Sequence, residues 1–305
     1  IIAVGSELLT PFRVDTNSLV ITDRLNAIGF DVAQKSVVGD DVDRLATLLA
    51  EALATADLVV CTGGLGPTAD DVTRDAVSRA LGMPLDQDPT ILAGIAARFA
   101  RRGLVMPAIN GRQAMVPRGA VVLDNANGTA PGLWIEVPES RLALLPGPPR
   151  EMTPMLETLV RERLAPLTGG RGLFRRVLKI TGRAESDVDA VAQPIYGPLR
   201  DRPVPIETTI LAVFGQIELH LTAAARTRAE ADVALDRAVG ALEASLGPSV
   251  YSTDGRTLEA VVGDLLRASS ATVAVAESCT GGLLMSRLTD VPGSSRYVDR
   301  SVVAY

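Results

Sequence analysis

The chain of 305 residues has few of the side chains on which many enzymes depend: one histidine, His220, and two cysteines, Cys61 and Cys279. A zinc cluster would have to be built from these three residues, which lie far apart in the sequence, and a Ser-His-Asp triad would have to use His220. His220 lies in the alternating run 216–221, which is typical of a half-buried strand, so a structural histidine is favoured. We therefore expect acid–base chemistry mainly from carboxylates, hydroxyls or a metal-bound water.

Long apolar runs and a basic net charge are also missing. No stretch reaches the roughly 18 consecutive apolar residues of a membrane-spanning helix, so we expect no membrane partner. The formal net charge of −6 argues against a nucleic-acid partner, whose binding surface should be basic. Two cysteines in glycine turns make a poor disulfide framework, which favours a cytoplasmic protein. No signal peptide is visible, and because the chain opens at Ile1 without a methionine, we expect its true start to lie upstream.

With 47% hydrophobic and 22% charged residues, the chain has the composition of a well-packed globular protein. Residues 1–168 alternate strand-like and helix-like segments, which predicts an α/β domain with a doubly wound, mostly parallel sheet. The strands are expected at 1–4, 30–38, 57–61, 133–137 and 142–145. The helices are expected at 16–28, 42–56, 72–81 and 89–102.

The pattern changes after Thr168-Gly169-Gly170. Residues 171–250 predict a small α+β module, with a strand at 173–181, a helix at 185–195, a hairpin around Gly215 and a helix at 228–246. Residues 251–305 predict the start of a second α/β domain, with a helix at 256–268, a strand at 272–276 and a further helix after a glycine turn. Because so short a segment cannot bury a core of its own, we expect this third domain to be cut off.

The pentapeptide CTGGL occurs twice, at 61–65 and at 279–283. In the first copy a strand ends, three glycines follow within four residues, and we expect a helix to open at Asp70 or Asp71. Backbone N–H groups of such a loop, beside a helix N-terminus and outside the carboxyl end of a strand, form an anion site. One aspartate there would serve as an N-cap, but two in succession favour a divalent cation that neutralises phosphate charge.

Further loops at strand ends are expected to meet the same pocket. These are Gly5-Ser6-Glu7, Gly39-Asp40-Asp41, the segment 127–132 and the segment 145–149. Each alone would be an ordinary turn. Together they predict a cleft of glycine backbone and acidic side chains, suited to a phosphate-bearing ligand with Mg²⁺.

The motifs GSELL, TGGLGPTADD, NGTAPG and LPGPPREM, in this order, resemble the CinA (competence/damage-inducible protein A) family. The wider resemblance is to the molybdopterin-binding domain of the MogA/MoeA type, in which TGGTG and a DVT-type helix start bind the pterin; Thr62–Gly66 and Asp71-Val72-Thr73 match this motif. The resemblance runs over essentially the whole chain. It implies an ADP-ribose pyrophosphatase domain at 1–168 and a KH-like module at 171–250.

Carried onto this sequence, the resemblance implies catalytic carboxylates at Glu7, Asp40, Asp70 and Asp71, of which Glu7, Asp70 and Asp71 would bind the metal, Mg²⁺ or else Mn²⁺ or Co²⁺. A metal-activated water would attack the pyrophosphate and give AMP and ribose 5-phosphate. GSELL stands where the family more often has GTELL, which keeps the hydroxyl. Substrate contacts are expected from Thr62, Gly63, Gly64, Gly66, Thr68, Asn127, Gly128, Pro146 and Gly147.

The second CTGGL has different flanking residues, so the need for a glycine turn explains the coincidence better than an internal repeat does. Ser278 lies just before the turn, either as an exposed nucleophile or as a helix cap. AESCTGG, DVPGSS and VVAY resemble the C-terminal amidase domain of CinA proteins, which removes ammonia from nicotinamide mononucleotide without a cofactor. There a serine acts with a tyrosine, matched by Ser278 and Tyr305, and with a lysine that would lie past Tyr305, so we expect this fragment to be inactive. Nucleotide contacts are expected from Thr280, Gly281 and Gly282.

The middle module shows no basic GxxG loop and no net charge, so an interaction or dimerisation role is favoured over RNA binding. Glu207 and Glu218 are candidates for a neighbouring active site, although solvated strand positions explain them equally well. We expect an enzyme of pyridine nucleotide salvage that acts on a small nucleotide and forms a homodimer. The alternatives are a molybdopterin-type binding or adenylyl-transfer protein and a non-catalytic competence factor.

Overall fold

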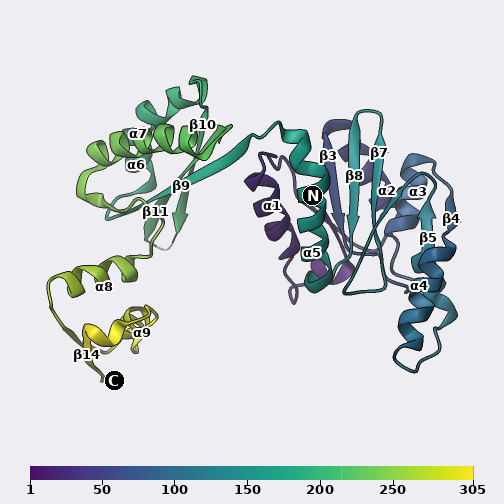
Figure 1. Ribbon diagram of the computed structural model, residues 1–305. Helices are drawn as coiled ribbons and strands as arrows, with labels where there is room; N and C mark the ends of the chain where they lie inside the picture. The colour runs from purple at the N-terminus through teal and green to yellow at the C-terminus, as the bar shows by residue number, and fades with distance from the viewer. Residues whose placement is uncertain (214, 305) are drawn as a thin grey trace. The chain divides into compact units, whose positions relative to one another are not determined.

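A computed structural model describes residues 1–213 and 215–304, and the chain divides into two compact units, Ile1–Gly170 and Arg171–Tyr305 (Figure 1). The first unit contains a six-stranded sheet in the order β2-β1-β3-β8-β7-β6. Neighbours from β2 to β8 run parallel, whereas β7 runs antiparallel to both of its neighbours, β8 and β6. This confirms the predicted mostly parallel sheet. The strands are β1 (Ile2–Val4), β2 (Ser36–Val38), β3 (Leu58–Thr62), β6 (Val121–Leu123), β7 (Gly132–Val137) and β8 (Ser140–Leu145).

Helices cover both faces of this sheet, as the doubly wound prediction requires. On one face lie α1 (Asn17–Ala27) and α5 (Pro149–Leu159), and on the other lie α2 (Val42–Thr55) and α3 (Thr73–Leu81) (Figure 1). Because successive strand residues point to opposite faces, Leu142 and Leu144 of β8 join the core under α2 and α3. Ala143 and Leu145 join the core under α1 and α5. A separate ribbon, β4 (Leu85–Gln87) with β5 (Met115–Pro117), contacts α3, and α4 (Pro89–Ala100) follows β4 in the chain.

The predicted elements differ from the observed ones mainly at their ends. The strand expected at 30–38 shrinks to β2, because its partner β1 offers ladder positions only from Ile2 to Val4. The helix expected at 72–81 begins at Thr73, beyond both Asp70 and Asp71. Its N-cap is Val72, which makes no side-chain cap.

The second unit begins with a four-stranded antiparallel sheet in the order β10-β11-β9-β12. Two helices, α6 (Glu185–Tyr196) and α7 (Arg228–Leu246), pack their apolar side chains on it. The element order βαββαβ is a split βαβ arrangement, and the hairpin predicted around Gly215 is confirmed. The strands are β9 (Gly172–Thr181), β10 (Ile206–Val213), β11 (Gln216–Ala225) and β12 (Val250–Ser252).

The last segment holds α8 (Leu258–Ala268), β13 (Val273–Glu277), α9 (Leu283–Thr289) and β14 (Val298–Val303). The two strands pair in parallel. None of the helices formed by the described residues has the length and apolar content that crossing a bilayer requires. Short 3₁₀ or π turns lie at Ser6–Leu9, Ala108–Ala114, Val160–Leu164, Ala165–Thr168, Gly197–Asp201, Gly247–Ser249 and Ser294–Arg296.

Candidate functional site

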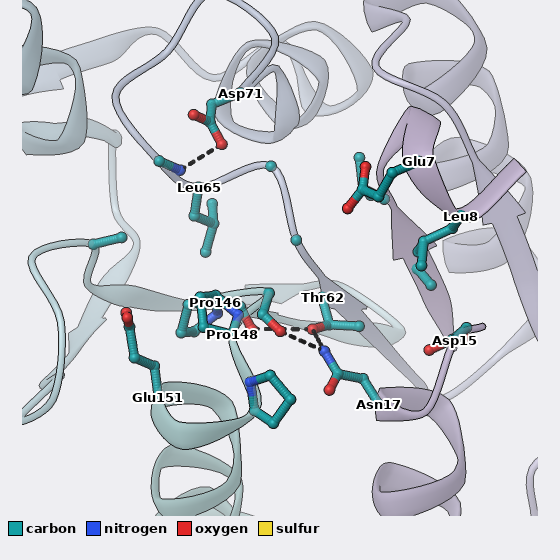
Figure 2. A pocket seen from close by; sticks show the side chains of 18 of the residues that line it. Glu7, Leu8, Asp15, Asn17, Thr62, Leu65, Asp71, Pro146, Pro148 and Glu151 are labelled. Carbon is teal, nitrogen blue, oxygen red and sulfur yellow. Dashed lines mark hydrogen bonds between the residues drawn. The ribbon is translucent and has the colours of Figure 1, made fainter. Parts of the chain in front are cut away.

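A cavity of about 610 Å³ lies at the carboxyl ends of three parallel strands, β1, β3 and β8 (Figure 2). Strand order reverses between β1 and β3, because β2 lies on one side of β1 and β3 on the other. Such a switch point is where open α/β sheets bind ligands, since the loops on either side diverge and leave a crevice. Eight of the residues predicted for the site line this cavity: Glu7, Thr62, Gly63, Gly64, Gly66, Asp71, Pro146 and Gly147.

The glycines of the first CTGGL let the loop pack directly on the end of β1. Gly63 and Gly64 adopt φ of +105° and +63°, which favour glycine. A Cβ on Gly63 would lie 2.2 Å from the carbonyl oxygen of Val4, which is backbone and cannot move aside. Only glycine fits at this position.

Thr73, the first residue of α3, donates hydrogen bonds to two successive carbonyl groups of the loop. The Oγ1 of Thr73 donates to the carbonyl oxygen of Gly63 at 2.9 Å, and the N–H of Thr73 donates to that of Gly64 at 3.2 Å. The peptide bonds of this loop are trans, as are all those of the described residues, and in a trans peptide the N–H points opposite to the C=O. The N–H groups of Gly64 and Leu65 therefore point away from α3. Among the described residues neither has a hydrogen-bond partner, and both residues line the cavity.

Asp71 braces this loop instead of capping α3. Its Oδ1 accepts from the N–H of Gly66 at 2.7 Å (Figure 2). Its Oδ2 accepts from the N–H and the hydroxyl of Thr68 at 2.8 and 2.5 Å. A carboxylate offers about four lone-pair sites, so most of those of Asp71 are used by the loop. Thr68 thus acts on Asp71 and does not itself line the cavity.

The predicted metal set is not assembled. In residues 1–213 and 215–304, no three carboxylate, cysteine or histidine side chains come together as ligands of one ion. Glu7 and Asp71 line the cavity, but Asp70 does not. Asp70 is exposed, and the hydroxyl of Thr68 bonds Asp71 instead. These residues do not fit a resident divalent cation, and we assign no chemical step to one.

Asp40 also lies outside the cavity, where it joins two loops. Its Oδ2 accepts from the N–H of Ser6 at 2.8 Å, and its own N–H donates to the Oγ of Ser6 at 3.0 Å. This reciprocal pair fixes the turn that carries Glu7 into the cavity wall. Asp40 therefore positions the loop after β1.

Thr62 and Asn17 tie the loops after β3 and β8 together. The Nδ2 of Asn17 donates to the Oγ1 of Thr62 at 3.1 Å and to the carbonyl oxygen of Gly147 at 2.8 Å. The Oγ1 of Thr62 donates to the carbonyl oxygen of Pro146 at 3.1 Å (Figure 2). Asn17 also lines the cavity, and the sequence prediction missed it because it reads as an ordinary residue of a helix start.

Glu151 and Asp15 are the acidic residues of the cavity wall that the prediction overlooked, and Glu151 is the more deeply buried of the two. It is 8% exposed, lies in the first turn of α5, and points toward the cavity from the side opposite the glycine loop (Figure 2). Its Oε2 accepts from the Nδ2 of Asn125 at 2.8 Å, while its Oε1 lies 3.8 Å from the Nε of Arg150. Glu151 belongs to the quoted motif LPGPPREM, but an acidic residue in the first turn of a helix is usual, so nothing singled it out.

The predicted contacts Asn127 and Gly128 support Glu151 and do not line the cavity. A Cβ on Gly128 would lie 1.8 Å from the Oε2 of Glu151, so this glycine allows the carboxylate and the loop to pack closely. The carbonyl oxygen of Gly128 accepts from Arg98 at 2.7 Å, and the Nδ2 of Asn127 donates to the carbonyl oxygen of Arg150 at 2.8 Å.

At the second CTGGL, the helix α9 is capped by Glu277 and not by Ser278. The carboxylate of Glu277 accepts from the N–H groups of Leu284 and Met285 at 2.9 and 3.0 Å. Burial would raise the pKa of Glu277, but hydrogen bonds from Thr280 and from these N–H groups outweigh it and hold that pKa below its usual value. Ser278 and Thr280 are exposed, and Gly281 and Gly282 adopt positive φ. Tyr305 lies outside the described residues.

In the middle module, Glu218 bridges two side chains on neighbouring strands. The Nε2 of His220 lies 2.8 Å from one of its oxygens, and the Nζ of Lys179 lies 3.0 Å from the other. Hydrogen bonding to His220 lowers the pKa of Glu218 although burial opposes this. The ion pair with Glu218 agrees with the structural role favoured for His220. Glu207, the other candidate of this module, is an exposed residue of β10.

Comparisons with known proteins agree with this architecture. Residues 1–166 match the family described as "Probable molybdopterin binding domain", and residues 255–305 match "CinA C-terminal domain". A "CinA-like protein" of Solibacter usitatus is 46% identical over 305 residues, which cover 100% of this chain and 72% of the relative. A "Putative competence-damage inducible protein" of Desulforudis audaxviator is 42% identical over 306 residues, covering 100% and 73%.

A solved structure is also similar to part of this chain. The protein CinA of unknown function from Thermoplasma acidophilum matches with 34% identity and a TM-score of 0.50, over 53% of this chain and 95% of that one. The relatives match this chain over its full length. The two family matches occur in the order that the motifs predicted. The chain belongs to the CinA family.

Proposed function

We propose that the first unit hydrolyses the pyrophosphate of ADP-ribose, or of a chemically similar nucleotide, to AMP and ribose 5-phosphate. The observation that supports this is the pairing of two free backbone N–H groups with a buried carboxylate across one cavity. The cavity volume of about 610 Å³ lies within the range of pockets that bury small ligands.

The N–H groups of Gly64 and Leu65 would bind non-bridging oxygens of one phosphate. The carbonyl groups of the same two peptides, those of Gly63 and Gly64, already accept hydrogen bonds from the hydroxyl and the N–H of Thr73 in α3. The loop therefore keeps its shape when a ligand arrives. Donors fixed in advance stabilise charge that develops at phosphorus without having to reorganise.

Glu151 would act as the general base. Asn125 holds the Oε2 of this carboxylate, and the Oε1, which lies 3.8 Å from the Nε of Arg150, would accept a proton from a water molecule in the cavity. The water oxygen attacks phosphorus, the P–O bond to the bridging oxygen breaks, and the two products leave as phosphate monoesters. The first unit contains no histidine, so a carboxylate is the base that this chemistry would use.

The amidase reading for Ser278 remains a prediction. The serine hydroxyl is exposed beside the glycine turn, as a nucleophile must be, but the structure supplies no partner that would activate it among residues 251–304.

The test is release of AMP from ADP-ribose, assayed with Mg²⁺, Mn²⁺ or Co²⁺ in the buffer. Glu151→Gln keeps the shape and removes the base, so we expect the kcat to fall by about 10² to 10⁴. The matched control is Glu157→Gln, an exposed carboxylate on the same helix that forms an ion pair with Arg24 and should change nothing. An unchanged kcat in Glu151→Gln contradicts the mechanism. No turnover by the unmodified chain, together with measurable pterin or nucleotide binding, favours the binding-protein alternative.

A further inference from the structure

Arg74 is a buried arginine directly behind the phosphate loop. It lies in the first turn of α3, is 4% exposed, and donates from its Nη1 to the carbonyl oxygen of Leu65 at 2.9 Å. Its Nε and Nη2 have no hydrogen-bond partner among the described residues. Burial lowers the pKa of Arg74 to about 10, opposed in part by Asp71 and Asp75, so the side chain is charged at neutral pH.

Among the described residues, the Arg74 guanidinium makes one hydrogen bond, to the carbonyl oxygen of Leu65, while two of its nitrogens stay buried and unbonded. A buried charge with unmet donors destabilises a protein, and an apolar side chain of similar volume there is often neutral or stabilising. Charged groups that are kept at such a cost are concentrated at functional sites. We therefore expect Arg74 to serve the site formed by the adjoining cavity.

The peptide between Leu65 and Gly66 links Arg74 to Asp71. Its carbonyl oxygen accepts from Arg74, and its N–H donates to the Oδ1 of Asp71. One peptide group thus lies between a buried positive charge and a negative charge. Removal of Arg74 would free the carbonyl oxygen of Leu65 and leave the charge of Asp71 less compensated.

That compensation matters because the cavity wall is acidic. Its charged residues are Arg13 and four carboxylates, namely Glu7, Asp15, Asp71 and Glu151. A phosphate would meet net negative charge at this wall. A positive charge one peptide behind the loop offsets Asp71, the carboxylate bonded directly to that loop.

We propose that Arg74 is a positioning residue for the phosphate of the ligand. It fixes the Leu65–Gly66 peptide and offsets the negative charge of Asp71, so that the N–H groups of Gly64 and Leu65 can donate to an anion. This rests on the proposed function only in taking a phosphate ester as the ligand. The prediction concerns the phosphate-dependent part of affinity and not the affinity for the nucleoside.

The experiment compares the equilibrium binding of AMP and adenosine by calorimetry, for the full chain and for Arg74→Met. We expect the Kd of AMP to rise at least tenfold, which is about 1.4 kcal/mol, while the Kd of adenosine stays the same. We also expect the thermal unfolding temperature to stay the same or to increase. Arg74→Lys keeps the charge without the planar guanidinium, and should recover part of the AMP affinity.

The matched control is Arg79→Met on the same helix, whose exposed guanidinium pairs with Asp43 away from the loop and should leave both affinities unchanged. An equal loss of AMP and adenosine in Arg74→Met, or no loss of AMP, overturns the inference. If Arg74→Met fails to fold, the ratio of AMP to adenosine affinity in Arg74→Lys decides: an unchanged ratio overturns the inference, and a lowered ratio supports it. Phosphate-dependent binding that requires Arg74, without hydrolysis of ADP-ribose, would refute only the proposed reaction.

Discussion

The two CTGGL segments have identical sequences, but their backbones are bonded in different ways. In the first, the brace is Asp71, which follows the turn, and it bonds Gly66 and Thr68 while leaving the N–H groups of Gly64 and Leu65 free. In the second, the brace is Glu277, which precedes the turn and bonds Leu284 and Met285.

The second turn satisfies its own backbone. Gly281 donates to the carbonyl oxygen of Ser278, Leu283 donates to that of Thr280, and the N–H of Gly282 bonds Glu277. The first turn therefore leaves two backbone N–H groups for a ligand, whereas the second offers mainly the exposed hydroxyls of Ser278 and Thr280. A glycine motif specifies a turn, and the position of the nearest carboxylate decides what the turn can bind.

The largest difference is expected from alanine at equivalent glycines. Gly63→Ala places a Cβ against the carbonyl oxygen of Val4 at φ +105°, so we expect a loss of more than about 4 kcal/mol in the free energy of unfolding. Gly281→Ala meets nothing within 4 Å at φ +60°, and should cost only the left-handed penalty of about 1–2 kcal/mol.

Urea unfolding measures both variants. Trp134, the chain's single tryptophan, is buried in the first unit and reports its unfolding by fluorescence. Circular dichroism reports Gly281→Ala, and Gly82→Ala, which has open space and φ +64° in the first unit, is the matched control. Equal losses for Gly63→Ala and Gly82→Ala would mean that the contact with Val4 does not matter.

The two turns show which features of the fold are predictable from local sequence and which are not. The strand–turn–helix pattern and the glycines are local, so the sheet, the helix of 228–246 and the loop at β3 were predicted correctly. The partners of side chains are set by tertiary packing. Asp71, predicted as a metal ligand, is therefore a brace of the loop. The residues before Glu151 and Arg74 do not distinguish them in the sequence, and only the folded chain brings these two side chains to the cavity wall and to the loop.

An intermediate effect is expected from the brace of the second turn. The pKa of Glu277 lies below its usual value, so the folded state binds a proton less readily than the unfolded state does. Its stabilising contribution is complete above the ordinary value of 4.5 and is lost as the pH falls through the lowered pKa. Glu277→Gln should therefore lower the unfolding temperature at pH 7, and the difference from the unmodified chain should shrink as the pH falls below 4.5.

Thermal unfolding followed by circular dichroism between pH 7 and pH 3 tests this. The control is Glu243→Gln, an exposed carboxylate on α7. A difference that stays constant with pH would show that the side-chain shape of Glu277, and not its charge, holds the turn.

The smallest effect is expected at the two cysteines, which begin the two pentapeptides. Cys61 is 0% exposed on β3, and burial raises its pKa to about 12, so it is neither accessible nor ionised at pH 8. Cys279 is exposed. Cys279→Ser should change the free energy of unfolding by less than about 0.5 kcal/mol, as most surface substitutions do.

Alkylation with iodoacetamide at pH 8, followed by peptide mass spectrometry, distinguishes the two thiols. We expect Cys279 to react in the folded chain and Cys61 to react only after unfolding in urea. Modification of both at similar rates would mean that β3 opens readily, and it would contradict the rigid loop on which the proposed phosphate binding depends. Because the reactive group and its following residues are the same, the ratio of the two rates measures how differently the fold packs two identical pentapeptides.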